Sequence, residues 1–97
     1  MSRIERSYRA QIDVQKIWVY VAERNYAAAD RLIDEFDESL SLLSRHPYMG
    51  EAVAELQPGV RRLVVNSYLL FYEPLENGIR LLRVFHSSRR IQSLLDD

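Results

Sequence analysis

Cysteine is absent from this chain of 97 residues. A disulfide framework and a metal site built on thiolates are therefore excluded. No apolar run approaches the length that a membrane-spanning helix needs, and the opening residues, Met1 to Glu5, do not have the character of a signal peptide. We expect a cytoplasmic protein with no membrane contact.

Lysine is almost absent as well, because Lys16 is the only lysine among thirteen basic residues. The formal net charge is −1, which argues against a protein held on nucleic acid mainly by charge. We therefore expect no direct sequence-specific binding of nucleic acid. Residues 58–97 carry six arginines against four acidic residues, whereas residues 1–57 carry seven basic and ten acidic residues. The C-terminal part is the positive part.

The composition, with 47% hydrophobic and 28% charged residues, is ordinary for a globular protein. A chain of this length buries roughly 60–65% of its unfolded surface, which is enough for one domain to fold alone. Internal repeats and low-complexity segments are absent from the sequence. We expect a single domain over residues 1–97.

The stretch from Val60 to His86 predicts three consecutive antiparallel strands. Three runs rich in β-branched and aromatic residues are separated by turn-forming segments, at Val60–Val65, Tyr68–Tyr72 and Ile79–His86. Asn77 and Gly78 suit a tight reversal. Because Pro74 precedes them, we expect a loop over residues 73–78, longer than a two-residue turn.

The sequence upstream of this stretch predicts a helical hairpin. The first helix follows Ser7, a suitable N-cap, and breaks at residues 23–25. The second helix begins at Tyr26 and ends before Pro47, because the residue before a proline disfavours helical backbone. Apolar residues recur every three or four positions, at Ala10, Val14, Ile17 and Val21 and then at Ala29, Ile33, Phe36, Leu40 and Leu43. Two helices so closely joined run antiparallel and cover one face of the sheet.

Short flanking elements complete the predicted fold. The alternation in Arg3–Arg6 predicts a brief strand that adds to the sheet. For residues 51–56 we predict a helical turn or an irregular connection. The spacing of apolar residues in 87–95 predicts a short C-terminal helix. The prediction is an α+β fold of order β-α-α-β-β-β, with a helical hairpin packed on a small antiparallel sheet.

Six short motifs follow one another along most of the chain, from about Ser7 to Arg90. They are Asp13-Val14-x-x-Ile17-Trp18-x-Tyr20, Asn25-x-Ala27-Ala28, Pro47-x-x-Gly50, Gly59-x-Arg61, Tyr68-x-x-x-Tyr72 and Arg83-Val84-x-His86-x-x-Arg89. In this order they resemble the ParE family, a branch of the ParE/RelE superfamily of bacterial toxins. The resemblance implies the toxin of a type II toxin–antitoxin system, neutralised by tight binding of a ParD-like antitoxin.

The superfamily contains two kinds of toxin. ParE-type members are associated with inhibition of DNA gyrase, and RelE-type members with cleavage of messenger RNA on the ribosome. Cleavage of RNA needs a base, an acid and cations for the developing phosphate charge. A RelE-like site in this chain would use Arg61, Arg83 and His86, with Glu51 or Glu55 as a further candidate.

The middle predicted strand distinguishes the two kinds. RelE-like nucleases usually carry an arginine there, in a pattern like Tyr-Arg-Leu-Val-Tyr, whereas this chain has Leu69 at that place. Because leucine cannot neutralise a phosphate, we expect a ParE-like inhibitor of DNA gyrase with no catalytic residues. A RelE-like ribonuclease is the alternative, and a non-toxic antitoxin-binding module is a further one. For His86 we favour a structural role, a hydrogen bond to the predicted C-terminal helix that fixes the direction of this helix.

Four residues are expected at the antitoxin interface: Trp18, Tyr20, Arg61 and Arg83. Trp18 and Tyr20 lie on a helix whose apolar stripe already fills the core face, so they border a binding surface. Alternation places Arg83 on the same strand face as Ile79, Leu81 and Phe85. It is therefore either paired with an acid from the helices or placed at the sheet edge to receive an acidic antitoxin.

The target-binding surface is assigned to Arg89 and Arg90, in the short basic segment after the last strand. No metal site is expected. The acidic residues of the second helix have no histidine beside them and are spread around the helix, which is typical of a solvated face. No cofactor is expected either.

Overall fold

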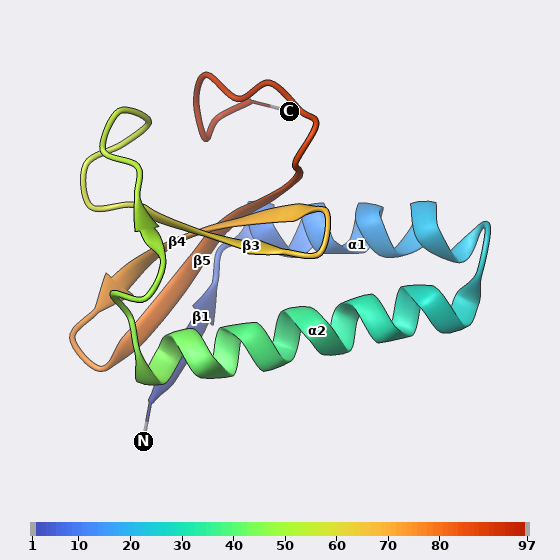
Figure 1. Cartoon of the computed structure of the whole chain (residues 1–97), viewed down its shortest axis with the longest axis horizontal. Helices are drawn as coiled ribbons and strands as arrows, with labels where there is room; N and C mark the ends of the chain where they lie inside the picture. Colours follow the sequence, from blue (N-terminus) through green and yellow to red (C-terminus); the bar gives the residue numbers. More distant parts are fainter. Residues whose placement is uncertain (1, 97) are drawn as a thin grey trace.

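A five-stranded sheet forms the centre of the computed structural model, which describes residues 2–96 (Figure 1). The elements are β1 (Arg3–Arg6), α1 (Tyr8–Ala22), α2 (Tyr26–Arg45), β2 (Glu51–Ala52), β3 (Arg61–Val65), β4 (Tyr68–Leu75) and β5 (Gly78–His86). The strand order is β1-β5-β4-β3-β2. β1 runs parallel to β5, and the other neighbouring strands are antiparallel. The predicted α+β fold is confirmed, with a parallel pair at one edge of the sheet.

The helical hairpin covers one face of the sheet, with α1 and α2 side by side (Figure 1). Both helices begin where the sequence predicts. The Ser7 hydroxyl accepts the Ala10 N–H at 3.0 Å, and the Asn25 side-chain oxygen accepts the Ala28 N–H at 3.0 Å. These N-caps satisfy backbone donors that a helix start leaves free.

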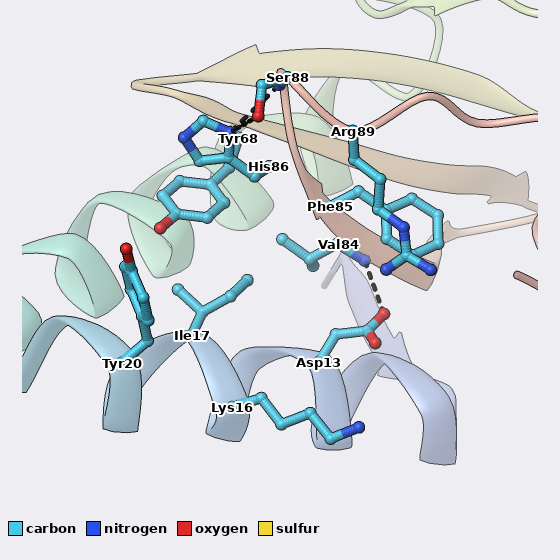
Figure 2. A pocket seen from close by; sticks show the side chains of 10 residues that line it. All are labelled: Asp13, Lys16, Ile17, Tyr20, Tyr68, Val84, Phe85, His86, Ser88 and Arg89. Carbon is cyan, nitrogen blue, oxygen red and sulfur yellow. Dashed lines mark hydrogen bonds between the residues drawn. The ribbon is translucent and has the colours of Figure 1, made fainter. Parts of the chain in front are cut away.

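Apolar side chains pack on both faces of the sheet. The helix-facing cluster includes Leu70 and Tyr72, whereas the alternate residue Phe71 belongs to the outer cluster. In the helix-facing cluster, Ile17 of α1 lies toward Val84 and Tyr68 (Figure 2). The outer cluster also contains Phe85 of β5, and it is completed by Val53 and Val60 from the β2–β3 loop and by Leu94 from the C-terminal segment. The sheet is therefore covered on both faces.

A β-bulge in β5 changes the face on which Arg83 lies. Tyr72 is opposite Leu81 and Phe71 is opposite Arg83, so Leu82 is the extra residue. Arg83 consequently shares the outer face with Phe71, not the helix-facing side with Leu81. The prediction that Arg83 shares a face with Leu81 is therefore wrong, because it assumed an unbroken alternation.

The hairpin between β4 and β5 is tighter than predicted. Leu75 pairs with Gly78, which leaves a two-residue turn in place of the expected longer loop. Pro74 is tolerated within β4 because β3 pairs with β4 only as far as Tyr72. A Cβ on Gly78 would lie 1.9 Å from the Arg3 carbonyl oxygen, so the close approach of β1 requires glycine here.

Two segments differ from the sequence prediction. Residues 51 and 52 pair with Arg62 and Arg61 as strand β2, where a helical turn or irregular crossing was expected. Residues 87–96 contain no helix. Leu94 packs on the outer cluster, and its carbonyl oxygen accepts a bond from Arg83, so this segment turns back onto the sheet.

Tyr72 joins the sheet to the connection after α2. Its buried hydroxyl accepts the Gly50 N–H at 2.9 Å and donates to the Pro47 carbonyl oxygen at 2.8 Å. Burial raises the pKa of Tyr72, and the bond from Gly50 and the charge of Arg61 oppose this effect. A Cβ on Gly50 would meet the Tyr72 oxygen at 2.5 Å. The spacing Pro47-x-x-Gly50 is therefore required by this contact.

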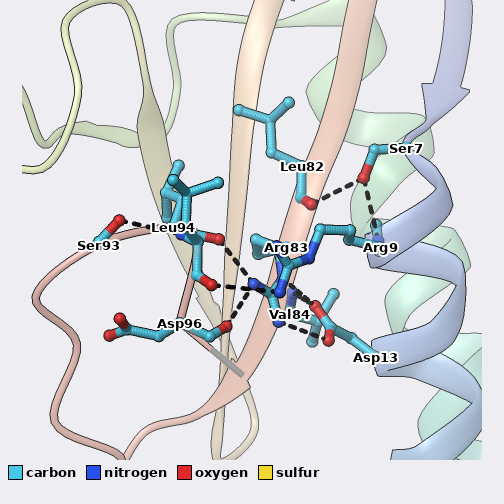
Figure 3. Close-up of polar contacts among 11 residues, drawn as sticks. Ser7, Arg9, Asp13, Leu82, Arg83, Val84, Ser93, Leu94 and Asp96 are labelled. Carbon is cyan, nitrogen blue, oxygen red and sulfur yellow. Dashed lines mark hydrogen bonds and ion pairs between the residues drawn. The ribbon is translucent and has the colours of Figure 1, made fainter.

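Side chains of α1 replace a strand along part of the β5 edge (Figure 3). β1 is paired with β5 only as far as Leu81. Beyond that point the Ser7 hydroxyl donates to the Leu82 carbonyl at 2.8 Å, and the Asp13 carboxylate accepts the Val84 N–H at 3.0 Å. These bonds satisfy an edge that would otherwise be open.

Asp13 also forms a bidentate ion pair with Arg83 (Figure 3). The Arg83 Nε and Nη2 atoms lie 2.7 and 2.9 Å from the two carboxylate oxygens. Nη1 donates to the carbonyl oxygens of Leu94 and Asp96 at 2.6 and 2.5 Å. Arg83 is only 4% exposed. One guanidinium thus joins the helical hairpin, the sheet and the C-terminal segment.

We predict that Arg83→Met lowers the free energy of unfolding by about 3–5 kcal/mol, because it leaves a largely buried carboxylate without its cation. Urea unfolding measures this change. The matched control is Arg80→Met on the same strand, whose ion pairs with Glu5 and Glu73 are more exposed and screened by water, so its effect should be much smaller. Equal losses in the two variants would contradict the assigned role of Arg83.

Candidate functional site

Arg61 lies at the end of the sheet next to the C-terminus of α2. Its Nε and Nη2 atoms donate to the carbonyl oxygens of Gly50 and Tyr48 at 2.8 and 3.2 Å. The guanidinium lies 5.3 Å from the centre of the Tyr48 ring. These contacts hold the connection between α2 and β2, while Tyr48 itself remains 72% exposed.

His86 lies at the other end of the sheet, opposite Tyr68. Its Nδ1 atom accepts the Ser88 N–H at 3.1 Å and lies 2.7 Å from the Ser88 hydroxyl. Its ring packs edge-on against Tyr68, with ring centres 5.2 Å apart. His86 therefore orients the chain as it leaves β5, the structural role that the sequence favoured, although no helix follows.

The three residues of a RelE-like site are not brought together. Arg61 pairs with Tyr72 and His86 pairs with Tyr68, positions four residues apart on β4, which corresponds to about 13 Å along a strand. Arg83 lies on the outer face of the sheet, and its guanidinium is occupied by Asp13 and backbone carbonyls. In this structure the three residues therefore lie at separate places on the sheet.

Leu69 lies at the place where a nuclease would carry an arginine. It packs at the border of the outer cluster and is half-buried. Its neighbour in register on β5 is Phe85, also an apolar residue. The Leu69 side chain therefore offers packing surface and supplies no cation for a phosphate.

A pocket of about 440 Å³ opens between α1 and the end of β5 (Figure 2). Its lining residues are Asp13, Lys16, Ile17, Tyr20, Tyr68, Val84, Phe85, His86, Ser88 and Arg89. The hydroxyl groups of Tyr20 and Tyr68 point toward each other in Figure 2. Burial, followed by the nearby Tyr20, raises the pKa of Tyr68, so its hydroxyl stays protonated and can donate a hydrogen bond.

Trp18 and Tyr20 differ in how far they are available to a partner. The Trp18 indole donates to the Asp30 carboxylate at 3.0 Å and packs edge-on against Tyr26, so it links the two helices. Tyr20 is 58% exposed and lines the pocket. Arg61 is at the opposite end of the hairpin, beside the residues that follow α2.

Arg83 resolves the alternatives that the sequence left open. It is paired internally, and the partner is Asp13 of α1. The side chain is buried and bonded on both sides, so in this structure it is not exposed to a partner. Arg90 is exposed, whereas Arg89 is half-buried and stacks 4.4 Å from the centre of the Phe85 ring.

Asp13 and Lys16 were not among the predicted site residues. Their spacing of three places both on one side of α1, and Asp13 occurs in the first of the resemblance motifs. This spacing does not indicate which strand they face. The bulge in β5 and the return of the C-terminal segment determine that, and neither has a local sequence signal.

Metal binding and membrane insertion find no support in residues 2–96. The described residues contain no group of three or more histidine, aspartate or glutamate side chains arranged to hold a metal ion. No helix in the same range has the length and hydropathy to cross a membrane.

Comparisons with known proteins give a consistent result. The family model for the ParE toxin of the type II toxin–antitoxin system parDE matches residues 4–91. Toxin ParE1 of Caulobacter vibrioides is 30% identical over 92 residues, which cover 92% of this chain and 93% of that protein. Toxin ParE1 of Mycobacterium tuberculosis is 31% identical over 87 residues, covering 88% and 89%.

A solved structure shares the fold. The chromosomal ParDE toxin–antitoxin system from P. aeruginosa contains a chain that matches with a TM-score of 0.72 at 20% identity. The match covers 89% of this chain and 96% of the solved one. With the family model matching almost the whole length, the chain belongs to the ParE family of toxins from type II toxin–antitoxin systems.

Proposed function

We propose that this ParE-family toxin binds and inhibits DNA gyrase, blocking replication, and performs no catalytic chemistry of its own. The observation that carries the proposal is the separation of Arg61, Arg83 and His86, the three residues that an RNA-cleaving relative would need together. Leu69 in place of a cation supports the same conclusion. Inhibition by binding needs only a surface that fits the target.

The target surface is assigned to the C-terminal segment, through Arg89 and Arg90. This segment is anchored to the sheet by Leu94, which is only 7% exposed, and by the bonds from Arg83. Arg90 is exposed. An anchored segment loses less conformational entropy on binding than a free tail, which favours tight contact with a large enzyme.

The same chain is neutralised by tight binding of a ParD-like antitoxin. The antitoxin surface has two ends. Tyr20, with Trp18 beside it, lies at one end, and Arg61 lies at the other. The helix α2, with 20 residues, separates these ends by about 30 Å. An antitoxin segment that reaches both needs about nine residues in extended form. Such a segment would follow the helical hairpin.

The first prediction concerns the target. The purified chain should inhibit DNA supercoiling by purified gyrase, and its expression without an antitoxin should arrest growth. An agarose-gel supercoiling assay over a range of toxin concentrations measures the effect. Unimpaired supercoiling at toxin concentrations well above that of gyrase would contradict the proposal, and healthy cells would favour a non-toxic antitoxin-binding module.

The second prediction concerns Arg90. Arg90→Glu should weaken gyrase inhibition at least tenfold, because an exposed contact residue then carries the opposite charge. Arg31→Glu is the control, since Arg31 is also exposed but lies on α2. Thermal unfolding should show both variants folded. Equal inhibition by both variants would remove Arg90 from the target surface.

The third prediction concerns Tyr20. Tyr20→Ala should weaken antitoxin binding at least tenfold, which corresponds to about 1.4 kcal/mol, because an exposed tyrosine at the edge of a pocket is typical of an anchoring residue. Tyr8→Ala is the matched control on the same helix, where Tyr8 is 76% exposed and lies outside the pocket. Calorimetric titration measures both. An unchanged affinity in Tyr20→Ala would exclude this part of the surface.

A further inference from the structure

The pocket between α1 and β5 carries two cations without an internal counterion. Within residues 2–96, the structure shows no carboxylate paired with Lys16 or with Arg89. The Arg89 guanidinium stacks on Phe85, which leaves its N–H groups available at the edges. Both residues line the same pocket.

Several arginines elsewhere on the surface form ion pairs with carboxylates, whereas Lys16 and Arg89 do not within the described part of the chain. Arg62 forms an ion pair with Glu51, and Arg80 forms ion pairs with Glu5 and Glu73. Among the described residues that line the pocket, Asp13 alone is acidic, and its oxygens are already bonded to Arg83 and to the Val84 N–H. The pocket therefore has a positive charge that no described residue balances.

The remaining groups of the pocket are apolar surface and hydrogen-bond donors. Ile17, Val84 and Phe85 contribute apolar surface. The Tyr20 and Tyr68 hydroxyls can donate, as the protonated state of Tyr68 allows. The Nδ1 atom of His86 is occupied by the Ser88 N–H, which places the proton of the neutral ring on Nε2 as a further donor. The pocket fits a ligand with an apolar body and carboxylates.

We propose that this pocket binds an acidic amphipathic segment of the antitoxin, with an apolar side chain over Ile17 and Val84 and flanking carboxylates on Lys16 and Arg89. The inference rests on the proposed function, in which an antitoxin binds this chain. It assigns the role of acid receptor to Lys16 and Arg89, because Arg83 is buried and satisfied.

Occupation of the pocket would also explain how the antitoxin neutralises the toxin. Arg89 lines the pocket and belongs to the segment assigned to the target. An antitoxin carboxylate bound to Arg89 therefore covers that residue and lies one residue from Arg90. The antitoxin and gyrase then compete for one surface, and no change in the toxin fold is needed.

The test compares charge reversal with charge retention in the full chain. The probe is the full-length antitoxin, expressed from the reading frame beside the gene for this chain, and its affinity is measured by calorimetric titration. The charge-reversed double variant, Lys16→Glu with Arg89→Glu, should weaken binding at least a hundredfold. The charge-retaining double variant, Lys16→Arg with Arg89→Lys, should bind the antitoxin with an affinity within threefold of that of the unmodified chain. The control, Arg31→Glu with Arg45→Glu, changes the same charge at exposed positions of α2 outside the pocket.

A second variant covers the case in which charge reversal disturbs folding. Lys16→Gln with Arg89→Gln removes the charge without introducing repulsion, and it should weaken binding at least tenfold. Thermal unfolding of each variant shows that the loss does not come from unfolding. Salt should weaken binding of the unmodified chain more steeply than binding of the glutamine variant, since the variant has lost two screened contacts.

Each other outcome overturns the inference. If the antitoxin binds the unmodified and charge-reversed chains equally, the pocket is not its site, while the proposed function stands. If the antitoxin does not bind the unmodified chain, the inference and that part of the proposed function fail together. If charge reversal leaves antitoxin binding intact but abolishes binding of a single-stranded DNA 20-mer, the pocket receives nucleic acid.

Discussion

The bidentate ion pair between Asp13 and Arg83 is the interaction on which the arrangement of this fold depends. It joins α1 to the edge of β5 where β1 has ended, and the same guanidinium holds the C-terminal segment through two carbonyl oxygens. A buried pair of this kind is stable only when both partners are fully bonded, and the described residues contain no buried polar side-chain atom without a partner. Arg83 therefore has a structural role in this fold.

The structural role of Arg83 also limits what this residue can do in function. Within the superfamily, the sheet can carry cations for cleavage of RNA or a surface for binding a target. Here Arg83 is buried, the middle strand carries Leu69, and Arg61 and His86 hold the chain at opposite ends of the sheet. Lys16 and Arg89, which line a pocket, have no carboxylate partner among the described residues. This distribution favours a protein that acts through complementary surfaces.

The sequence predicts most of this fold because its signals are local. The apolar spacing of the two helices and the caps at Ser7 and Asn25 place the hairpin correctly. The errors come from long-range contacts: the bulge at Leu82 reverses the faces of β5, and Arg83 binds the carbonyls of residues 94 and 96, which form no helix. The pocket could not be predicted for the same reason, since its walls are distant in sequence.

The most direct test of the central claim, that this toxin acts by binding and not by catalysis, is to map messenger-RNA ends on translating ribosomes. The purified chain is added to a reconstituted translation reaction that lacks gyrase. We expect no new RNA ends at any codon position, because Arg61, Arg83 and His86 lie at separate places on the sheet. Cleavage at ribosomal positions that increases with toxin concentration would contradict it.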